Sequence, residues 1–364
     1  MGRTLVTGAT GFVGAQVARR LVERGDDVRV LLRPQADEEA LTGLDAETVR
    51  GDLLDRRAVR RALRGIERVF HTAGMASLEG GSEGEAAVFR ANVDTARTVL
   101  EESQRADVER VVLTSSAAAV GPAPYGQTAD EDQVFNAAGL GIPYVDAKRE
   151  VEAEAFRFAA RGLPVVCVNP TLVFGAGDRR AVATSLVWRF LLGEVSVYPD
   201  GAVNIVDVDD VARAHLLADS EGLSGERYLV GNRNYTLERL FTDLARLSGV
   251  EPPPLKLPVM LAVPFARAME AVPGGSPISV PEAAVASRWW TYRSTKASRE
   301  LGWEPSHHED TLEATVDWCR RTDGAAIARA RTSQPARYKA ASAVLAVLQQ
   351  GERLAGGVAR RLGF

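Results

Sequence analysis

The first two-thirds of the chain alternates short, β-branched apolar runs with longer segments whose apolar residues recur every three or four positions. The short runs predict buried strands, and the longer segments predict amphipathic helices that cover them. The predicted helices include 15–24, 85–104 and 144–160. The predicted strands are 4–7, 28–32, 48–50, 68–71, 110–114 and 164–168. The pattern therefore predicts an α/β fold built on a doubly wound parallel sheet, a Rossmann fold.

Beyond residue 170 the alternation loosens into helical segments separated by proline and glycine. We expect a dinucleotide-binding domain from residues 1–174 plus about 203–220, and a smaller, mostly helical substrate-binding lobe from about 175–202 and 221–323. Residues 324–364 form a basic extension with a charge of +6 and apolar residues at helical spacing. This extension is interpreted as a packing or dimer helix, or alternatively as a peripheral membrane-surface helix.

Composition and charge exclude several classes of protein. Apolar residues make up 46% of the chain, charged residues 25%, and the net charge is −4, which is ordinary globular usage and gives no reason to expect a nucleic-acid partner. The two cysteines and four histidines predict neither a disulfide framework nor a metal site, and the adjacent His307 and His308 are interpreted as a solvated loop. With no leader pattern and no apolar stretch of about 18 residues, we expect a cytoplasmic protein without a transmembrane segment.

A glycine-rich turn joins the first predicted strand to the first helix. Gly8, Gly11 and Gly14 stand where the chain must reverse and where a phosphate must approach the backbone. The free N–H groups of the following helix then face that phosphate. The pattern predicts a nicotinamide dinucleotide on this turn. The residues expected to bind it are Thr7, Gly8, Thr10, Gly11, Phe12, Val13 and Gly14.

The end of the second predicted strand carries the signal for the form of the cofactor. Enzymes that use the unphosphorylated cofactor usually place an acid there, which binds the ribose 2′-hydroxyl. This chain places Arg33 there, and a guanidinium can bind a 2′-phosphate with paired hydrogen bonds. NADP(H) is therefore favoured, and NAD(H) stays open. Asp52, after the third strand, is a candidate for the adenine amino group or for a helix cap, although Asp55 is better placed to cap.

Tyr144 and Lys148 stand four residues apart at the start of a predicted helix, so their side chains share one face. A phenol titrates at about pH 10, and a neighbouring cation lowers that pKa, which lets tyrosine act as an acid or base. Seven tyrosines and four lysines give about 0.08 such pairs by chance. Because the chain has 40 Arg and only 4 Lys, lysine at this position indicates a chemical demand that Arg does not meet. We predict that both residues are catalytic.

The predicted strand 110–114 ends in two serines at the carboxyl edge of the sheet, where α/β proteins bind their ligands. A hydroxyl there can hydrogen-bond a substrate oxygen and hold it beside the tyrosine. Ser116 is the third catalytic candidate, and Ser115 is the alternative.

Together these residues resemble the extended short-chain dehydrogenase/reductase family, also called the NAD-dependent epimerase/dehydratase family. The match includes the turn Thr7–Gly14, the Tyr-x-x-x-Lys of Tyr144 and Lys148, and Ser116, and it runs over roughly residues 3–322. Asp207 stands where the family commonly has histidine. Residues 169–175 look most like the dihydroflavonol reductase, hydroxysteroid dehydrogenase and hopanoid-associated branch. Further cofactor-binding positions implied by the resemblance are Leu53, Thr72, Ala73, Gly74, Asn92, Asn169 and Pro170.

The resemblance implies hydride transfer between the nicotinamide and a carbonyl carbon. Tyr144 would exchange the proton, Lys148 would bind the nicotinamide ribose, and Ser116 would polarise the carbonyl. Asn92 would hold a relay water or, equally, make a hydrogen bond between helices. Similar family members dimerise through the helices that match 85–104 and 144–160, so a homodimer is expected.

Three functions remain open at this stage. An NADP(H)-dependent dehydrogenase or reductase would act on a ketone, aldehyde or secondary alcohol of a hydrophobic substrate. A nucleotide-sugar epimerase or dehydratase would keep NAD bound, with Arg179, Arg180 and Arg189 as cations for a sugar diphosphate. A non-catalytic cofactor sensor on the same fold is the third. The first is favoured by Arg33 and by apolar side chains that line the predicted lobe or form its core: Trp188, Phe190, Leu191, Leu192, residues 257–269, Trp289, Trp290 and Tyr292.

Overall fold

The structure is a computed structural model that describes residues 2–76, 82–270 and 278–330. The chain divides into two compact units, and each is described by itself. The first consists of Met1–Thr184, Val203–Asn234 and Trp289–Thr315, and the second of Ser185–Ala202, Tyr235–Arg288 and Val316–Phe364.

The first unit is built on a seven-stranded sheet in the order β10-β6-β5-β4-β1-β2-β3, and every neighbouring pair is parallel. This confirms the predicted fold class. The seventh strand, β10, extends the sheet beyond the six that the hydrophobic pattern predicts. The strands are β1 (Arg3–Thr7), β2 (Asp27–Leu32), β3 (Glu47–Arg50), β4 (Arg68–His71), β5 (Arg110–Thr114), β6 (Val165–Pro170) and β10 (Arg227–Val230).

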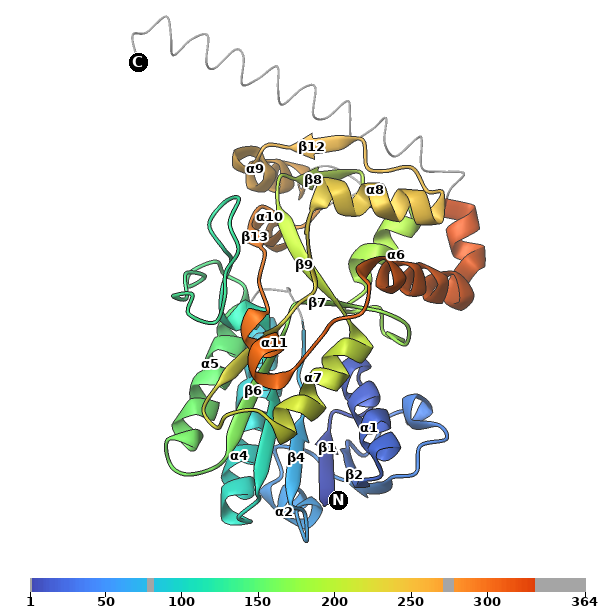
Figure 1. The fold of residues 1–364 in the computed structure, drawn as a ribbon. Helices are drawn as coiled ribbons and strands as arrows, with labels where there is room; N and C mark the ends of the chain where they lie inside the picture. The colour runs from blue at the N-terminus through green and yellow to red at the C-terminus, as the bar shows by residue number, and fades with distance from the viewer. Residues whose placement is uncertain (1, 77–81, 271–277, 331–364) are drawn as a thin grey trace, which may run out of the picture. The chain divides into compact units, whose positions relative to one another are not determined.

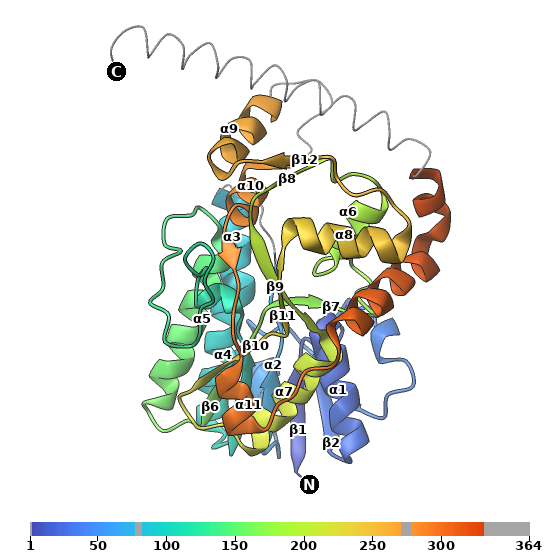
Figure 2. The ribbon, with the colours of Figure 1, turned by 45° about the horizontal axis from the view of Figure 1, so that its top comes forward.

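Helices cover both faces of this sheet, because successive strand side chains point to opposite sides and both sides are apolar. On β1, for example, Val6 faces one core and Leu5 the other. The first face packs on α1 (Phe12–Arg24), α7 (Val208–Ser220) and α11 (Thr295–Leu301). The second packs on α2 (Arg56–Ala62), α4 (Thr95–Arg105) and α5 (Pro143–Ala159) (Figures 1 and 2).

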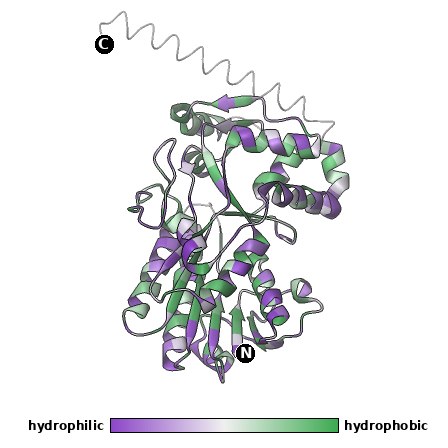
Figure 3. Cartoon of the chain, viewed as in Figure 1, coloured by the Kyte–Doolittle hydropathy of each residue, from purple (hydrophilic) through white to green (hydrophobic). Residues whose placement is uncertain are grey.

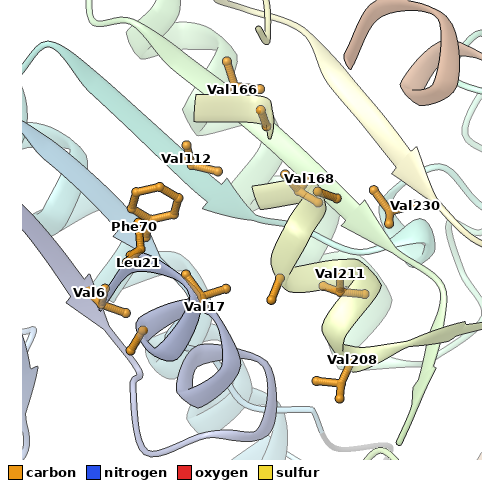
Figure 4. Close-up of a cluster of buried hydrophobic side chains, with 14 of the residues drawn as sticks. Val6, Val17, Leu21, Phe70, Val112, Val166, Val168, Val208, Val211 and Val230 are labelled. Atoms are coloured by element: carbon orange, nitrogen blue, oxygen red, sulfur yellow. The ribbon is translucent and has the colours of Figure 1, made fainter. Parts of the chain in front are cut away.

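The first core is filled mainly by β-branched residues. Figure 4 shows Val17 of α1 and Val211 of α7 beside Val112 and Val168 of the central strands. Hydropathy follows the same layout, since the central strands are hydrophobic while the helices alternate hydrophobic and hydrophilic residues (Figure 3). Burial of both sheet faces holds the carboxyl ends of β1, β4, β5 and β6 at one edge of the sheet, where the candidate residues gather.

The predicted helix 85–104 is interrupted in the structure. It consists of α3 (Ser82–Phe89), a π-helical turn η2 (Arg90–Asp94) and α4. The wider turn contains Asn92, whose side-chain amide donates to the carbonyl of Val88 at 2.8 Å. A π turn adds a single residue to the repeat, which leaves the apolar spacing on either side intact, so periodicity does not reveal it.

The first unit also contains short elements around the sheet edge. Residues 175–184, 221–234 and 289–315, which the sequence pattern assigns to the substrate lobe, lie in this unit. For 221–234 the reason is that β10 joins the parallel sheet. β7 pairs in parallel with β9, within a small sheet ordered β11-β9-β13. These elements are η1 (Glu39–Leu41), η3 (Ala117–Ala119), β7 (Leu172–Phe174), all but the first residue of β9 (Ala202–Asp207), the first two residues of β11 (Arg233–Thr236), and β13 (Trp289–Trp290).

The second unit has a small aromatic and aliphatic core. Phe241 stacks on Phe190, with ring centroids 5.7 Å apart, and meets Tyr198 edge-on at 5.2 Å. Its elements are α6 (Ser185–Leu191), β8 (Val197–Pro199), α8 (Leu237–Ser248), β12 (Leu255–Leu257), α9 (Val259–Glu270) and α10 (Val280–Ala286). Residues 308–330 are helical and end the described part of the chain.

Most of the basic extension, residues 331–364, lies outside the described residues, and so do its predicted packing and membrane roles. Among the described residues, no helix is both long enough and apolar enough to cross a membrane.

Candidate active site

In the glycine turn between β1 and α1, two of the three glycines are tightly packed against neighbouring residues. Gly8 has φ of +76°, and a Cβ there would lie 2.6 Å from the backbone nitrogen of Ala73. A Cβ at Gly14 would meet the Gly8 carbonyl and the Thr72 hydroxyl. At Gly11, by contrast, the Gly8 carbonyl oxygen at 3.2 Å is the single contact within 4 Å. Gly8 and Gly14 therefore let the segments pack together, and Gly11 leaves the turn open on one side.

Helix α1 begins at Phe12, and its first turn contains no acidic residue. Its first N–H groups have no acceptors within the helix, and the positive end of its dipole is not neutralised by a carboxylate in that turn. Val13 and Thr10 are half-buried beside it. This geometry fits a phosphate group, as the sequence predicts.

Lys148 is buried at the end of β5. Its ammonium donates to the carbonyl of Thr114 at 2.9 Å and lies 5.9 Å from the centroid of the Tyr144 ring. Helix α5 begins at Pro143 after Ile142, so Tyr144 and Lys148 occupy its first two turns and face the sheet edge. The hydroxyl of Ser116 lies close enough to the phenol of Tyr144 to lower its pKa. The three predicted catalytic side chains thus lie together.

The structure separates the two serine candidates. Ser115 is buried, and its hydroxyl donates to Glu152 at 2.9 Å, pointing away from the phenol. Ser116 is half-buried, caps η3 by accepting from the N–H of Ala118 at 3.1 Å, and contacts Tyr144. Alternation along the extended chain puts the two hydroxyls on opposite faces. Ser116 is therefore the serine that lies at the phenol.

Burial governs the protonation of the pair. It lowers the pKa of Lys148 to about 8, against interactions with Cys167 and Glu152 that raise it. Burial also raises the pKa of Tyr144, and the hydrogen bond from Ser116 opposes that rise. The sequence predicts that the lysine lowers the pKa of the phenol. In the structure this pKa is raised, because burial of the phenol has the larger effect.

Asn92 and Gly74 complete the surroundings of Lys148. A Cβ at Gly74 would lie 2.7 Å from the Asn92 side-chain oxygen and 3.5 Å from the ammonium of Lys148. The Asn92 amide also donates to the carbonyl of Met75 at 3.0 Å and accepts from its N–H at 3.3 Å. Asn92 therefore holds the loop after β4 against the helix. The observed bonds therefore link the helix to a loop, whereas the predicted alternatives were a bond between helices and a relay water.

Two further sequence candidates lie in the interior. Asn169 is fully buried, and its amide donates to the Ser116 carbonyl at 3.0 Å and to Glu152 at 2.6 Å. Pro170 is also buried at the end of β6. The side chain of Thr7 is engaged as well, since its hydroxyl is 2.7 Å from Nδ1 of His71. These side chains lie in the interior, next to the residues of the site.

Residues 4–231 match the model of the NAD dependent epimerase/dehydratase family, which is more than half of the chain. The chain belongs to this family. The predicted membership in the extended short-chain dehydrogenase/reductases is thereby confirmed, and with it an NAD(P)-binding oxidoreductase that acts on C=O and CH–OH groups.

Relatives of this family member include reductases and dehydrogenases. It is 40% identical over 262 residues to sterol demethylase protein B of Methylococcus capsulatus, covering 71% of this chain and 78% of the relative. It is 35% identical over 322 residues, 86% of this chain and 93% of the relative, to a Synechocystis sp. protein that carries the name dihydroflavonol 4-reductase. A 3β-hydroxysteroid dehydrogenase/Δ5→4-isomerase of Mycobacterium tuberculosis is 31% identical over 253 residues, 64% of this chain and 65% of the relative.

Solved structures of family members share the fold. The crystal structure of gox2253 has a TM-score of 0.79 at 34% identity and covers 88% of this chain and 99% of its own. UDP-glucose 4-epimerase of Thermotoga maritima, with UDP-glucose, has a TM-score of 0.71 at 26% identity, covering 88% and 99%. MoeE5, in complex with UDP-glucuronic acid and NAD, has a TM-score of 0.70 at 27% identity, covering 88% and 100%.

Arg33 is exposed directly after β2. Among the described residues its guanidinium makes no hydrogen bond or ion pair, and two nearby acids are engaged elsewhere, Glu38 with Arg50 and Glu39 with Arg179. The guanidinium is therefore open to solvent. Asp52 is exposed too, and its carboxylate accepts from the N–H of Leu54 at 2.9 Å.

Asp55 caps α2 by accepting from the N–H of Arg57, the role for which the sequence favoured it over Asp52. Asp207, at the position where family members commonly have histidine, caps α7 by accepting from the N–H of Asp209 at 2.8 Å. The described residues contain no cluster of side chains that could hold a metal ion.

The apolar candidates of the predicted lobe have different roles. Phe190 and Leu191 are core residues of the second unit, and Trp188 is half-buried. In the first unit Tyr292 is buried, and its hydroxyl lies 2.9 Å from the Gly121 carbonyl and 3.2 Å from the Ala117 carbonyl. Trp290 packs against the cluster of buried hydrophobic residues that includes Tyr292. Tyr292 therefore holds the segment that follows Ser116.

Two of the three arginines considered for a sugar diphosphate form ion pairs. Arg189 pairs with Glu282 at 2.5 Å, and Arg179 pairs with Glu39. Arg180 is exposed. A diphosphate would have to compete with those two carboxylates for the paired guanidinium groups.

His215, which sequence reasoning missed, lies beneath the site on α7. Its Nδ1 is 2.8 Å from the carbonyl of Val211, which can only accept, so Nδ1 carries the proton. Its Nε2 then accepts from the hydroxyl of Thr114 at 2.7 Å. Burial lowers the pKa of His215 to about 4, and the charge of Lys148 also lowers it. A helix residue with an apolar neighbourhood gives no sequence signal for this contact.

The neutral state of His215 predicts a dependence of stability on pH. Above pH 6.5 the histidine is neutral in both folded and unfolded chains, and its contribution is fully present. As the pH falls from 6.5 toward about 4, the unfolded chain binds the proton and the folded chain does not, so stability is lost. Between pH 7 and pH 5 this one group removes about 2 kcal/mol from the free energy of unfolding.

Urea denaturation at pH 7 and pH 5 measures this loss. His215→Gln should lose about 2 kcal/mol less than the unsubstituted protein between the two pH values, whatever its stability at pH 7. Replacing exposed His307 with glutamine removes a histidine without changing a buried group, and should leave the loss unchanged. Equal losses in the unsubstituted protein and His215→Gln would contradict the assignment of a buried, neutral His215.

Proposed function

We propose that the protein is an NADP(H)-dependent oxidoreductase that transfers a hydride between the nicotinamide and a carbonyl or secondary alcohol of a hydrophobic substrate. The observation that carries the proposal is the grouping of Ser116, Tyr144 and Lys148 at the carboxyl edge of the sheet. Family membership supplies the class of chemistry. The names of three relatives, a sterol demethylase protein, a dihydroflavonol reductase and a hydroxysteroid dehydrogenase, favour a hydrophobic substrate.

The residues of the first unit fit the cofactor. Gly11 leaves the turn open, α1 presents free N–H groups, and Gly74 keeps the space above Lys148 clear of a Cβ. Phosphates would bind at Gly11 and the start of α1, and the adenosine end would reach Asp52 and Arg33. When bound, the reduced cofactor supplies the hydride that the carbonyl carbon receives.

The side chains of Ser116, Tyr144 and Lys148 then stabilise the carbonyl oxygen and supply its proton. The hydroxyls of Ser116 and Tyr144 both donate to the carbonyl oxygen as negative charge develops on it, and Tyr144 gives up its proton. The ammonium of Lys148, oriented by the Thr114 carbonyl, binds the nicotinamide ribose and stabilises the phenolate that forms. Oxidation of an alcohol uses the same contacts in reverse.

The second candidate is a nucleotide-sugar epimerase or dehydratase. It is favoured by the likeness to the UDP-glucose epimerase and to the complex of MoeE5 with UDP-glucuronic acid and NAD. In that chemistry the hydride returns to the sugar, so the cofactor stays bound and external cofactor contributes no hydrogen. The two candidates therefore differ in the fate of the hydride.

Isotope transfer tests the proposal. The protein is incubated with NADPH that carries deuterium at C4 of the nicotinamide, in each stereoisomer, together with a panel of steroid, aromatic and long-chain ketones and aldehydes. At least one carbonyl compound should yield an alcohol with deuterium on the former carbonyl carbon, detected by mass spectrometry. Epimerisation of UDP-glucose without deuterium uptake, with the whole panel unreduced, would contradict the proposal and favour the second candidate.

Arg33 is proposed to select NADP(H) by binding the 2′-phosphate. Replacing Arg33 with aspartate puts a carboxylate opposite that phosphate, and each charge-assisted hydrogen bond lost is worth about 1.5–3 kcal/mol. The ratio of kcat/KM for NADPH to that for NADH should therefore fall at least about tenfold. Arg64, an exposed arginine between α2 and the start of β4, is the matched control, and Arg64→Asp should leave the ratio unchanged. An unchanged ratio in Arg33→Asp would remove Arg33 from this role.

A further inference from the structure

Glu152 is a fully buried acid one turn beyond Lys148 on α5. A buried carboxylate is costly unless charge and hydrogen bonds compensate it. Glu152 has three such partners: Arg227 donates to Oε1 at 2.7 Å, and Ser115 and Asn169 donate to Oε2 at 2.9 and 2.6 Å. A buried ion pair of this kind is weak evidence for stability, so its position calls for another explanation.

Two of these partners, Ser115 and Asn169, connect Glu152 to the backbone around Ser116. Ser115 precedes Ser116 at the end of β5, and the same Asn169 amide that binds Glu152 donates to the Ser116 carbonyl at 3.0 Å. Glu152 is thus linked to Ser116 along the chain through Ser115 and across the sheet through Asn169. These contacts fix the direction in which the Ser116 hydroxyl leaves the sheet.

The side chain of Arg227 is itself anchored. It lies on β10 beside Cys167 of β6 and donates through Nε and NH2 to the carbonyl of Glu131, at 3.1 and 2.5 Å. The seventh strand therefore supplies the cation that pairs with the buried carboxylate of Glu152. This gives β10 a function beyond extending the sheet.

We propose that Glu152 is a positioning residue, whose carboxylate orients Ser116 through Ser115 and Asn169 and serves as the negative counter-charge of the Lys148 ammonium. The inference rests on the proposed function, in which Ser116, Tyr144 and Lys148 act on a carbonyl. Glu152 acts through these groups and not on the substrate.

The charged and titratable groups around Lys148 come from four elements. Glu152 and Tyr144 lie on α5, Cys167 on β6, His71 on β4 and His215 on α7. Burial lowers the pKa of His71 to about 3 and that of His215 to about 4, and it raises the pKa of Cys167 and of Tyr144. Among the described residues at this site, Lys148 is therefore the group expected to titrate between pH 6 and pH 9, with its pKa of about 8.

The experiment measures that pKa directly. The chain has four lysines, so lysine labelled with ¹³C at Cε gives four resonances, and the resonance of Lys148 is assigned by its absence in Lys148→Arg. Titration between pH 6 and pH 11 should show Lys148 with the lowest pKa in the full-length protein. In Glu152→Gln that pKa should fall by about one unit, because the counter-charge is gone. Glu152→Asp keeps the charge and should restore most of the difference.

Glu154→Gln is the matched control. Glu154 lies two residues further on the same helix, is mostly buried, and pairs with Arg97 at 2.8 Å and Arg157 at 3.3 Å. The variant therefore also breaks an Arg–Glu pair but should leave the Lys148 pKa unchanged. Should Glu152→Gln not fold, Glu152→Gln combined with Arg227→Met removes both buried charges and should show the same lowering.

Kinetics then separate positioning from general stability. If the ammonium is needed, the alkaline decrease of kcat should begin about one pH unit lower in Glu152→Gln than in the unsubstituted protein. A purely structural role would lower kcat by the same factor at every pH. The same Lys148 pKa and the same alkaline limb in Glu152→Gln would overturn the inference. Activity that survives without Tyr144 would instead overturn the proposed function and leave the measured Lys148 pKa as an independent result.

Discussion

The site depends on one constraint, the burial of the Lys148 ammonium. This ammonium lies at the end of a sheet whose two faces are both covered by apolar side chains. The ammonium donates to the Thr114 carbonyl at 2.9 Å, and burial lowers its pKa to about 8. Its charge also acts on two neighbouring histidines, since it lowers the pKa of His71 and of His215. Burial has the larger effect on His215, whose pKa falls to about 4, so that this histidine stays neutral. Gly74 leaves room for Asn92, because a Cβ there would lie 2.7 Å from the Asn92 side-chain oxygen. A cation held in this way is ready to act on a phenol one helical turn away.

The glycine turn and the catalytic cluster belong to the same packing. Gly8 lies against the backbone of Ala73 at the end of β4, and the loop after β4 is held by Asn92 next to Lys148. A few residues of one loop thus join the segment predicted to bind phosphate to the segment predicted to be catalytic. This explains how a cofactor bound at Gly11 would reach the phenol with its nicotinamide end.

Much of this could be predicted from the sequence because it depends on local pattern. Strands buried on both faces are recognisable as apolar runs, and the spacing of Tyr144 and Lys148 defines a shared helix face. What sequence did not reveal depends on contacts between distant segments. β10 joins the sheet far along the chain from β6, and Arg227, the cation that pairs with Glu152, is 75 residues away from it in the sequence. The pKa of Tyr144 was expected to fall, but burial, which spacing does not encode, raises it.

The account is tested most directly by replacing the phenol and measuring a single turnover. With NADPH bound and a reducible carbonyl compound added, Tyr144→Phe removes only the hydroxyl that donates the proton. The account predicts a hydride-transfer rate lower by about 10²- to 10⁴-fold with the Kd for NADPH unchanged. Tyr125→Phe, at an exposed tyrosine, should leave the rate unchanged. A rate in Tyr144→Phe within about twofold of that of the unsubstituted protein would contradict the account, since proton transfer of this kind contributes far more.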